Sequence, residues 1–173
     1  MPEIEIQKYS LYLFDLDDTL TTSASGDKFP KTVDDRKWMP GRLEKLQALH
    51  AQGNKTAIIT NQGGAAWGIF SQEEMYDYLN NLVWEAGMDA FFVCFHDTGP
   101  KARASDKTIK ELTKPDHYKG HERRKPGPGM LIEAMDDFEI DRQDTLYIGD
   151  RPEDDQSAKA AGIDFIHADE YFK

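Results

Sequence analysis

Residues 9–20 read YSLYLFDLDDTL, an apolar run that ends in a cluster of acids. Its short run of apolar and aromatic residues predicts a buried strand over 9–15. The run stops at Asp15, Asp17 and Asp18, three carboxylates within four positions. Like charges this close repel one another, and burying them is costly unless a cation or hydrogen bonds compensate. We therefore expect a compensating positive charge at the end of this strand.

Strand and helix patterns alternate along the rest of the chain. Apolar runs predict further strands, and apolar residues at helical spacing, bounded by glycine, proline or capping residues, predict helices. The expected strands are 55–61, 89–96, 144–150 and 163–168, and the expected helices are 41–53, 71–87, 129–138 and 153–162. Such alternation is typical of a parallel sheet covered by helices on both faces. We expect an α/β fold with a doubly wound, Rossmann-like parallel sheet of about five strands.

The length of 173 residues suits a single domain over 1–173. Two inserts without a helical pattern, residues 18–40 and 96–125, are too short for a large cap domain. Each follows the carboxyl end of a predicted strand, the edge at which open α/β sheets bind ligands. We therefore expect both inserts to flank the functional site.

Composition and charge limit the class of protein. With 39% hydrophobic and 31% charged residues, the chain resembles a soluble globular protein, and no apolar run approaches the ~18 residues of a membrane span. The first residues lack the features of a signal peptide, and the single cysteine, Cys94, fits a reducing compartment. We expect a cytoplasmic protein with no membrane partner.

The charge is unevenly distributed. The net charge of −11 argues against non-specific binding of nucleic acid over a broad surface. Residues 97–125 are the exception, because this segment contains nine lysines and arginines and only five acidic residues. A local basic segment beside the site would suit a polyanionic substrate, although such a segment is often only a solvated loop.

Polar side chains end the other predicted strands at the same edge of the sheet. Thr60 and Asn61 end the second strand, Asp150 ends the fourth, Asp154 begins the following helix, and Lys125 closes the second insert. Taken singly, these residues suit turns, a helix N-terminus or a surface lysine. Together, carboxylates without histidine or cysteine suit a hard cation such as Mg²⁺, and a lysine beside them can neutralise a bound phosphate. The set suits phosphomonoester hydrolysis, with one carboxylate as nucleophile and another as acid and base.

Four motifs, FDLDDTL, IITNQ, RKPGPGM and IGDRPEDD, occur in this order over residues 11–162. Their order resembles the haloacid dehalogenase (HAD) superfamily of aspartate-dependent phosphatases. The resemblance implies that Asp15 is the nucleophile and Asp17 the general acid and base. It also implies that Thr60, Lys125 and the backbone amide of Asn61 bind phosphate.

The same resemblance implies a magnesium site. Its ligands would be Asp15, the backbone carbonyl of Asp17, and Asp150, with Asp154 supporting a metal-bound water. Asp18 stands where the superfamily often has glycine.

Within the superfamily, TNQGG and RKPGPGM look like subclass III. This subclass includes histidinol-phosphate phosphatases, heptose bisphosphate phosphatases and the phosphatase domain of polynucleotide kinase-phosphatase. Residues 21–35 resemble the Ser-Gly-x-x-Phe-Pro segment of polynucleotide 3′-phosphatases, and Trp38 or Trp67 could stack on a base. We therefore expect a 3′-phosphorylated polynucleotide end as substrate; the alternative is a small-molecule phosphatase of the heptose bisphosphate or histidinol-phosphate type.

The sugar-phosphate members carry a zinc loop, Cys-x-His followed later by Cys-x-Cys. This chain has Cys94 and His96, and His121 could replace one cysteine, but Arg123 stands at the last ligand position. Because a structural zinc site needs four ligands, we do not expect zinc.

Two other classes of function fit parts of the pattern. A phosphoacceptor signalling domain also clusters acids around Mg²⁺ and phosphorylates an aspartate. Asp17 favours the enzyme, because it places an acid and base beside the nucleophile. An inactive HAD-like binding module is disfavoured, because no key motif position is missing.

Overall fold

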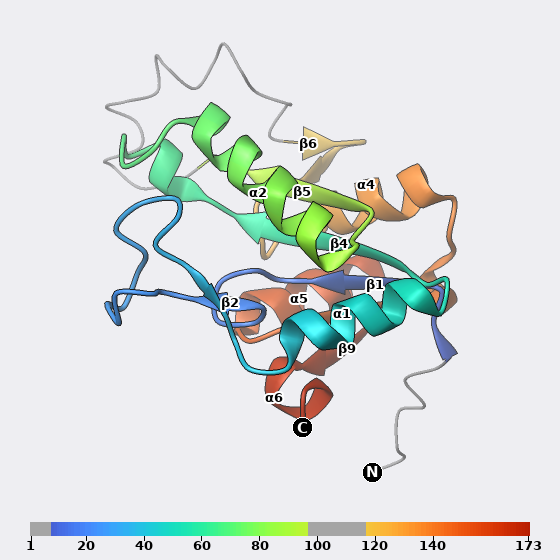
Figure 1. The fold of residues 1–173 in the computed structure, drawn as a ribbon. Helices are drawn as coiled ribbons and strands as arrows, with labels where there is room; N and C mark the ends of the chain where they lie inside the picture. Colours follow the sequence, from blue (N-terminus) through green and yellow to red (C-terminus); the bar gives the residue numbers. More distant parts are fainter. Residues whose placement is uncertain (1–7, 97–116) are drawn as a thin grey trace.

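The computed structural model describes residues 8–96 and 117–173, and a parallel sheet lies at the centre of this part of the chain (Figure 1). The sheet has five strands in the order β5-β4-β1-β8-β9, and all neighbours are parallel. The strands are β1 Leu11–Phe14, β4 Lys55–Asn61, β5 Ala90–Cys94, β8 Thr145–Gly149 and β9 Asp164–His167. The chain builds outward from β1 to β4 and β5, then returns to the other side of β1 with β8 and β9. This order confirms the doubly wound fold and places its switch point beside β1.

The central strand β1 is fully buried on both faces. Its alternate residues point to opposite sides of the sheet, so Leu11 and Leu13 belong to one core while Tyr12 and Phe14 belong to the other. The next residue, Asp15, still belongs to the sheet edge, because its amide donates to the carbonyl of Ile148 at 2.9 Å. Asp15 is therefore buried because it directly continues a strand that is buried on both faces.

Helices cover both faces of the sheet. Figure 1 shows α1 (Arg42–Ala51) and α2 (Gln72–Ala86) in front of the strands, with α4 (Gly129–Phe138) and α5 (Pro152–Ala161) behind them. A capping box of Ser71 and Glu74 begins α2, as the sequence predicts. A short helix α6 (Ala168–Tyr171) and the 3₁₀ turns η2 (Gly63–Ala65) and η3 (Arg142–Asp144) were not predicted. No helix in the described residues is both long enough and apolar enough to cross a membrane.

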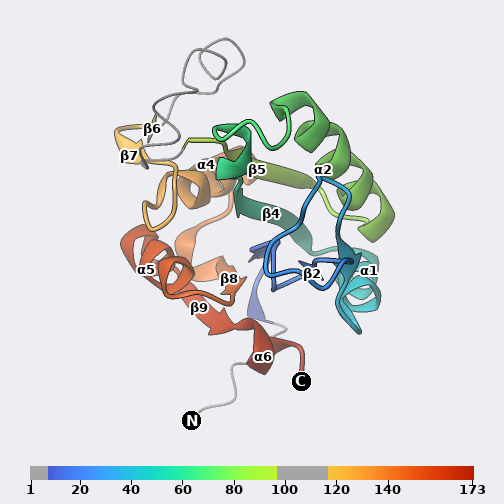
Figure 2. The same cartoon turned by 90° about the vertical axis from the view of Figure 1, so that its left-hand side faces the viewer.

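The two inserts form small antiparallel hairpins instead of a large cap, as far as residues 8–96 and 117–173 show. In the first, β2 (Thr21–Thr22) pairs with β3 (Lys37–Trp38); in the second, β6 (His117–Tyr118) pairs with β7 (His121–Glu122). Figure 2 shows β6 and β7 beside α4, well separated from the β2 segment. Residues 97–116, which hold most of the predicted basic segment, lie outside the described part.

Candidate active site

A pocket of about 330 Å³ opens at the carboxyl edge of the sheet. It is bounded by the ends of β1 and β4, by the first insert and by the start of α5. Six of the predicted site residues line it: Asp15, Asp17, Thr60, Asn61, Lys125 and Asp154. Asp150 lies beside the pocket, where its carboxylate accepts from the Thr19 hydroxyl at 3.2 Å. The topology therefore brings together all the side chains that the sequence places at separate strand ends.

The turn after β1 exposes one carboxylate and buries the other. Asp18 has a φ of 62°, which is a left-handed conformation that favours glycine but that aspartate tolerates. Its amide donates to the carbonyl of Thr21 at 2.6 Å and closes the turn. The side chain of Asp15 is only 9% exposed, whereas that of Asp17 is 30% exposed and lines the pocket.

Lys125 lies at the centre of the buried charges. Its Nζ is 2.8 Å from Asp15 Oδ1 and 2.8 Å from Asp154 Oδ1, and it also donates to the Tyr147 hydroxyl at 2.9 Å and the Ile59 carbonyl at 3.2 Å. Lys125 therefore supplies the positive charge that the carboxylates after β1 require.

Two neighbouring residues hold the backbone around Lys125. The Asn61 side chain donates to the Lys125 carbonyl at 3.2 Å and accepts from the Lys125 amide at 3.1 Å. Arg123 is buried, where it pairs with Glu133 at 2.8 Å and donates to the Val93 carbonyl at 3.1 Å. These contacts anchor the end of the second insert to β4, β5 and α4.

Burial and neighbouring charges shift the pKa values of these buried groups in opposite directions. Burial raises the pKa of Asp15 well above its ordinary value, and the attraction of Lys125 only partly offsets this. Burial alone would lower the pKa of Lys125, but the carboxylates of Asp15 and Asp154 outweigh it and raise that pKa. Burial likewise opposes ionisation of Asp154, yet Lys125 and the Tyr147 hydroxyl lower its pKa. Two carboxyl groups thus share one ammonium group, and the ionised form of Asp15 is the less stabilised of the two.

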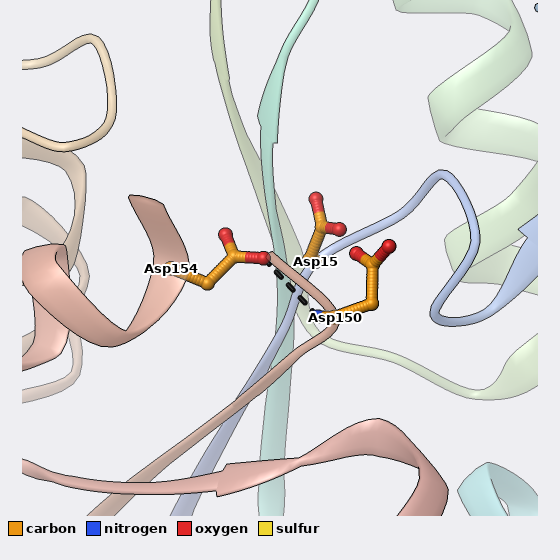
Figure 3. Close-up of side chains that lie close together, drawn as sticks. All are labelled: Asp15, Asp150 and Asp154. Atoms are coloured by element: carbon orange, nitrogen blue, oxygen red, sulfur yellow. Dashed lines mark hydrogen bonds between the residues drawn. The ribbon is translucent and has the colours of Figure 1, made fainter. Parts of the chain in front are cut away.

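Three carboxylates could hold a metal ion. Asp15, Asp150 and Asp154 each offer an oxygen, and these oxygens lie within 4.8 Å of one another. Figure 3 shows Asp15 between the other two, with the Asp154 carboxylate bonded to the Asp150 amide. Gly149 is required for this arrangement, because a Cβ at that position would lie 2.5 Å from Asp154 Oδ2. The oxygen-only set suits a hard divalent cation.

Four contributing residues were missed from the sequence. Thr19 lies 3.3 Å from Asp15, Tyr147 donates to Asp154 at 2.7 Å, and Gln62 and Arg36 both contact Asp17. Gln62 adjoins Thr60 and Asn61, so its position in the IITNQ motif was an available signal. In the sequence, Tyr147 is one of several residues in a predicted buried strand, and Arg36 is one of several charged residues in a polar insert. Neither pattern predicts a role in the site.

The residues considered for zinc lie apart from the carboxylates. Cys94 is buried in the core beneath α4, His96 is partly buried, and His121 is exposed on β7. Arg123, at the last ligand position of the zinc pattern, is engaged with Glu133. Of the described residues, only the three aspartates form a cluster of metal-binding side chains.

The tryptophans also separate. Trp67 lines the pocket, whereas Trp38 packs against the core and donates to Glu85 at 3.2 Å. Of the two, Trp67 is therefore the one placed to contact a substrate.

A doubly wound sheet with paired aspartates after its first strand and a lysine between buried carboxylates defines a hydrolase of the HAD superfamily. Residues 10–173 match the family model described as polynucleotide kinase 3 phosphatase, and the chain belongs to this family. The chain is a phosphoric monoester hydrolase.

Relatives and solved structures agree with this assignment. The chain is 33% identical over 144 residues to the D-glycero-beta-D-manno-heptose-1,7-bisphosphate 7-phosphatase of Rhodopseudomonas palustris, covering 79% of this chain and 72% of that one. It is 29% identical over 136 residues to the same-named enzyme of Pasteurella multocida, covering 76% and 67%. The D,D-heptose 1.7-bisphosphate phosphatase of B. bronchiseptica, solved with magnesium and phosphate, has a TM-score of 0.68 at 24% identity over 90% of this chain and 78% of that one, which supports the fold.

Proposed function

We propose that the protein is a Mg²⁺-dependent phosphomonoesterase that forms an acyl-phosphate (aspartyl-phosphate) intermediate on Asp15. The observation that carries this proposal is the position of Asp15, buried at the floor of an open pocket, 2.8 Å from Lys125 and beside two further carboxylates. A carboxylate with one cationic partner, facing a pocket of this size, is placed to attack a bound phosphate.

The roles of the other residues follow from their places. Thr60, the Asn61 amide and Lys125 would hold the phosphate while an Asp15 oxygen attacks phosphorus. The bond from phosphorus to the leaving oxygen breaks, its electron pair stays on that oxygen, and Asp17 gives the oxygen a proton. Asp17 then takes a proton from a water molecule whose oxygen attacks phosphorus, and the bond to Asp15 breaks to restore the carboxylate.

The residues present fit a magnesium ion. Asp15, Asp150 and the backbone carbonyl of Asp17 would be its ligands. One oxygen of Asp154 already accepts from Lys125 and Tyr147, and the other accepts from two backbone amides. Because both oxygens are engaged, Asp154 is better suited to support a metal-bound water than to bind the metal directly. When bound, Mg²⁺ would neutralise the carboxylates and stabilise charge on the phosphate.

For the substrate we place a small sugar bisphosphate first. Two relatives, 33% and 29% identical, are named as heptose bisphosphate phosphatases. The pocket is also lined by cations beyond Lys125, namely Lys28, Arg124 and Arg151. Such charges would favour a substrate with a second anionic group away from the reacting phosphate.

A 3′-phosphorylated polynucleotide end is the second candidate. The matching family model supports it, and so do two aromatic rings that line the pocket: Phe29 is 60% exposed and Trp67 is 50% exposed. Exposed rings beside a phosphate site can stack on a base. In the described part, however, two of the predicted basic residues are committed elsewhere, since Lys119 pairs with Asp136 and Arg123 with Glu133.

The test is Mg²⁺-dependent phosphate release from heptose 1,7-bisphosphate and from a 3′-phosphorylated oligonucleotide, with Asp15→Asn protein as the blank. Activity in the Asp15→Asn protein would refute the nucleophile. If a polynucleotide end is the substrate, Trp67→Ala should selectively slow phosphate release from the oligonucleotide. If a sugar bisphosphate is the substrate, Arg151→Gln should selectively slow phosphate release from the bisphosphate.

The single buried cysteine fits a reducing compartment, so we place this reaction in the cytoplasm.

A further inference from the structure

Arg36 is a buried arginine in the first insert, directly before β3. Its side chain is only 2% exposed. The guanidinium Nε donates to Asp17 Oδ1 at 2.8 Å, Nη2 lies 3.4 Å from Asp17 Oδ2, and Nη1 donates to the Val33 carbonyl. The guanidinium carbon also lies 5.5 Å from the centre of the Tyr78 ring. A buried guanidinium with this many partners is held in one orientation.

Gln62 completes the contacts around Asp17. Its Nε2 lies 2.9 Å from Asp17 Oδ2 and 2.8 Å from Thr60 Oγ1, and its Oε1 accepts from Arg36 Nη2 at 3.2 Å. Both oxygens of the Asp17 carboxylate are therefore fixed, by an arginine from the insert and an amide from the end of β4. The same amide links Asp17 to the Thr60 hydroxyl.

We propose that Arg36, supported by Gln62, is a positioning residue that holds the Asp17 carboxyl group in line for proton transfer to the leaving oxygen. This inference rests on the proposed function. Each carboxylate oxygen has two acceptor positions, and those of Oδ2 are taken by Arg36 and Gln62, whereas Oδ1 accepts from Arg36 Nε alone among these donors. Oδ1 can therefore carry and deliver the proton while Arg36 and Gln62 still hold the group. Without Arg36, a side chain that is 30% exposed would lose its bidentate partner and adopt other rotamers.

The chemistry of the leaving group separates this role from a structural one. An alcohol leaves poorly unless its oxygen receives a proton as the bond to phosphorus breaks, whereas p-nitrophenolate leaves without one. Loss of Asp17 positioning should therefore slow the hydrolysis of alcohol phosphates far more than that of p-nitrophenyl phosphate. A fraction of unfolded protein lowers both rates equally, so their ratio does not depend on folding.

The experiment compares kcat for p-nitrophenyl phosphate with kcat for heptose 1,7-bisphosphate or the 3′-phosphorylated oligonucleotide, whichever is hydrolysed. Arg36→Met should lower kcat on the alcohol phosphate by about 100-fold, as for loss of a general acid, and on p-nitrophenyl phosphate by less than about tenfold. Arg36→Lys should recover part of the loss. Lys37→Met, the matched control at an exposed neighbouring lysine, should leave both rates unchanged.

A double-mutant cycle shows whether Arg36 acts through Asp17. Asp17→Asn should give the same selective loss, and adding Arg36→Met to it should cost little more. An equal loss on both substrates in Arg36→Met, or additive losses in the double variant, would overturn the inference. Failure of the wild-type protein to release phosphate from any of these substrates, or full activity in Asp15→Asn, would instead overturn the proposed function and this inference with it.

Discussion

Replacing Lys125 with methionine should destabilise the folded protein strongly in the absence of metal. Methionine fills a similar volume but removes the ammonium that lies 2.8 Å from both Asp15 and Asp154. Removing one partner of a buried ion pair costs about 3–5 kcal/mol. Because burial already raises the pKa of Asp15, this carboxyl can take up a proton and relieve part of the repulsion. We therefore expect the lower end of that range, about 3 kcal/mol, which for a chain of this size corresponds to a fall in Tm of roughly 6–12 °C.

The pH dependence gives this prediction its sign. Without Lys125, the folded-state pKa values of Asp15 and Asp154 should both lie above those of the unfolded chain, so ionisation of either group opposes folding. The loss should be largest at neutral pH and above, and should shrink as the pH falls and the carboxylates become protonated. In the native protein the lowered pKa of Asp154 acts in the opposite direction: its contribution is present above the ordinary carboxyl pKa and is lost as the pH falls through the folded value.

The assay is urea denaturation followed by tryptophan fluorescence, with and without Mg²⁺. Mg²⁺ should restore more stability to the variant than to the native protein, since it would supply the missing positive charge. Lys119→Met is the control, because this lysine also pairs with an aspartate but is exposed, so its loss should go undetected. A Lys125→Met protein as stable as the native one at neutral pH would refute the reasoning.

Three further predictions concern Tyr147, the Arg123–Glu133 pair and the proposed metal ligand Asp15. Tyr147→Phe should lower the free energy of unfolding by about 1.5–3 kcal/mol, because it removes a buried hydroxyl bonded to Asp154; an unchanged urea midpoint would contradict this. Arg123→Met should cost about 3–5 kcal/mol by removing the guanidinium that pairs with the buried Glu133 carboxylate, whereas the double change with Glu133→Gln should cost less by the same assay. Mg²⁺ affinity, measured by calorimetry, should fall as the pH falls through the raised pKa of Asp15, since protons compete for that carboxylate; constant affinity would count against Asp15 as a ligand.

The fold could be read from local patterns to within a few residues. The strand predicted over 55–61 is β4, Lys55–Asn61, and the helix predicted over 129–138 is α4, Gly129–Phe138. The helix predicted over 41–53 is shorter, Arg42–Ala51, because the chain leaves the helix before Gly53, which has a φ of 81°. The two-residue strands of the hairpins were missed, because so short a strand has no periodicity to detect.

The candidate site was predictable where it depends on chain order. Asp15, Thr60 and Asp150 lie at the carboxyl ends of β1, β4 and β8, which are neighbours in the parallel sheet, so a doubly wound fold brings them to one edge. Lys125 was predicted from its motif to lie beside the carboxylates, although its contacts with the Tyr147 hydroxyl and the Ile59 carbonyl were not predicted. The pairing of Arg123 with Glu133 was also missed, since ten residues separate them and neither lies at a strand end.

The alternation of strands and helices, the edge of the sheet that carries the site, and the residue types gathered there all follow from the amino-acid sequence. Those features depend on periodicity and order along the chain, which are local properties. The partners of each buried charge, in contrast, are established only when the chain has folded. Lys125 lies between two carboxylates, Arg36 of the first insert contacts Asp17, and the Tyr147 hydroxyl donates to Asp154. These contacts depend on the free-energy cost of burying charged groups. That cost arises only when segments distant in the sequence pack together and exclude water.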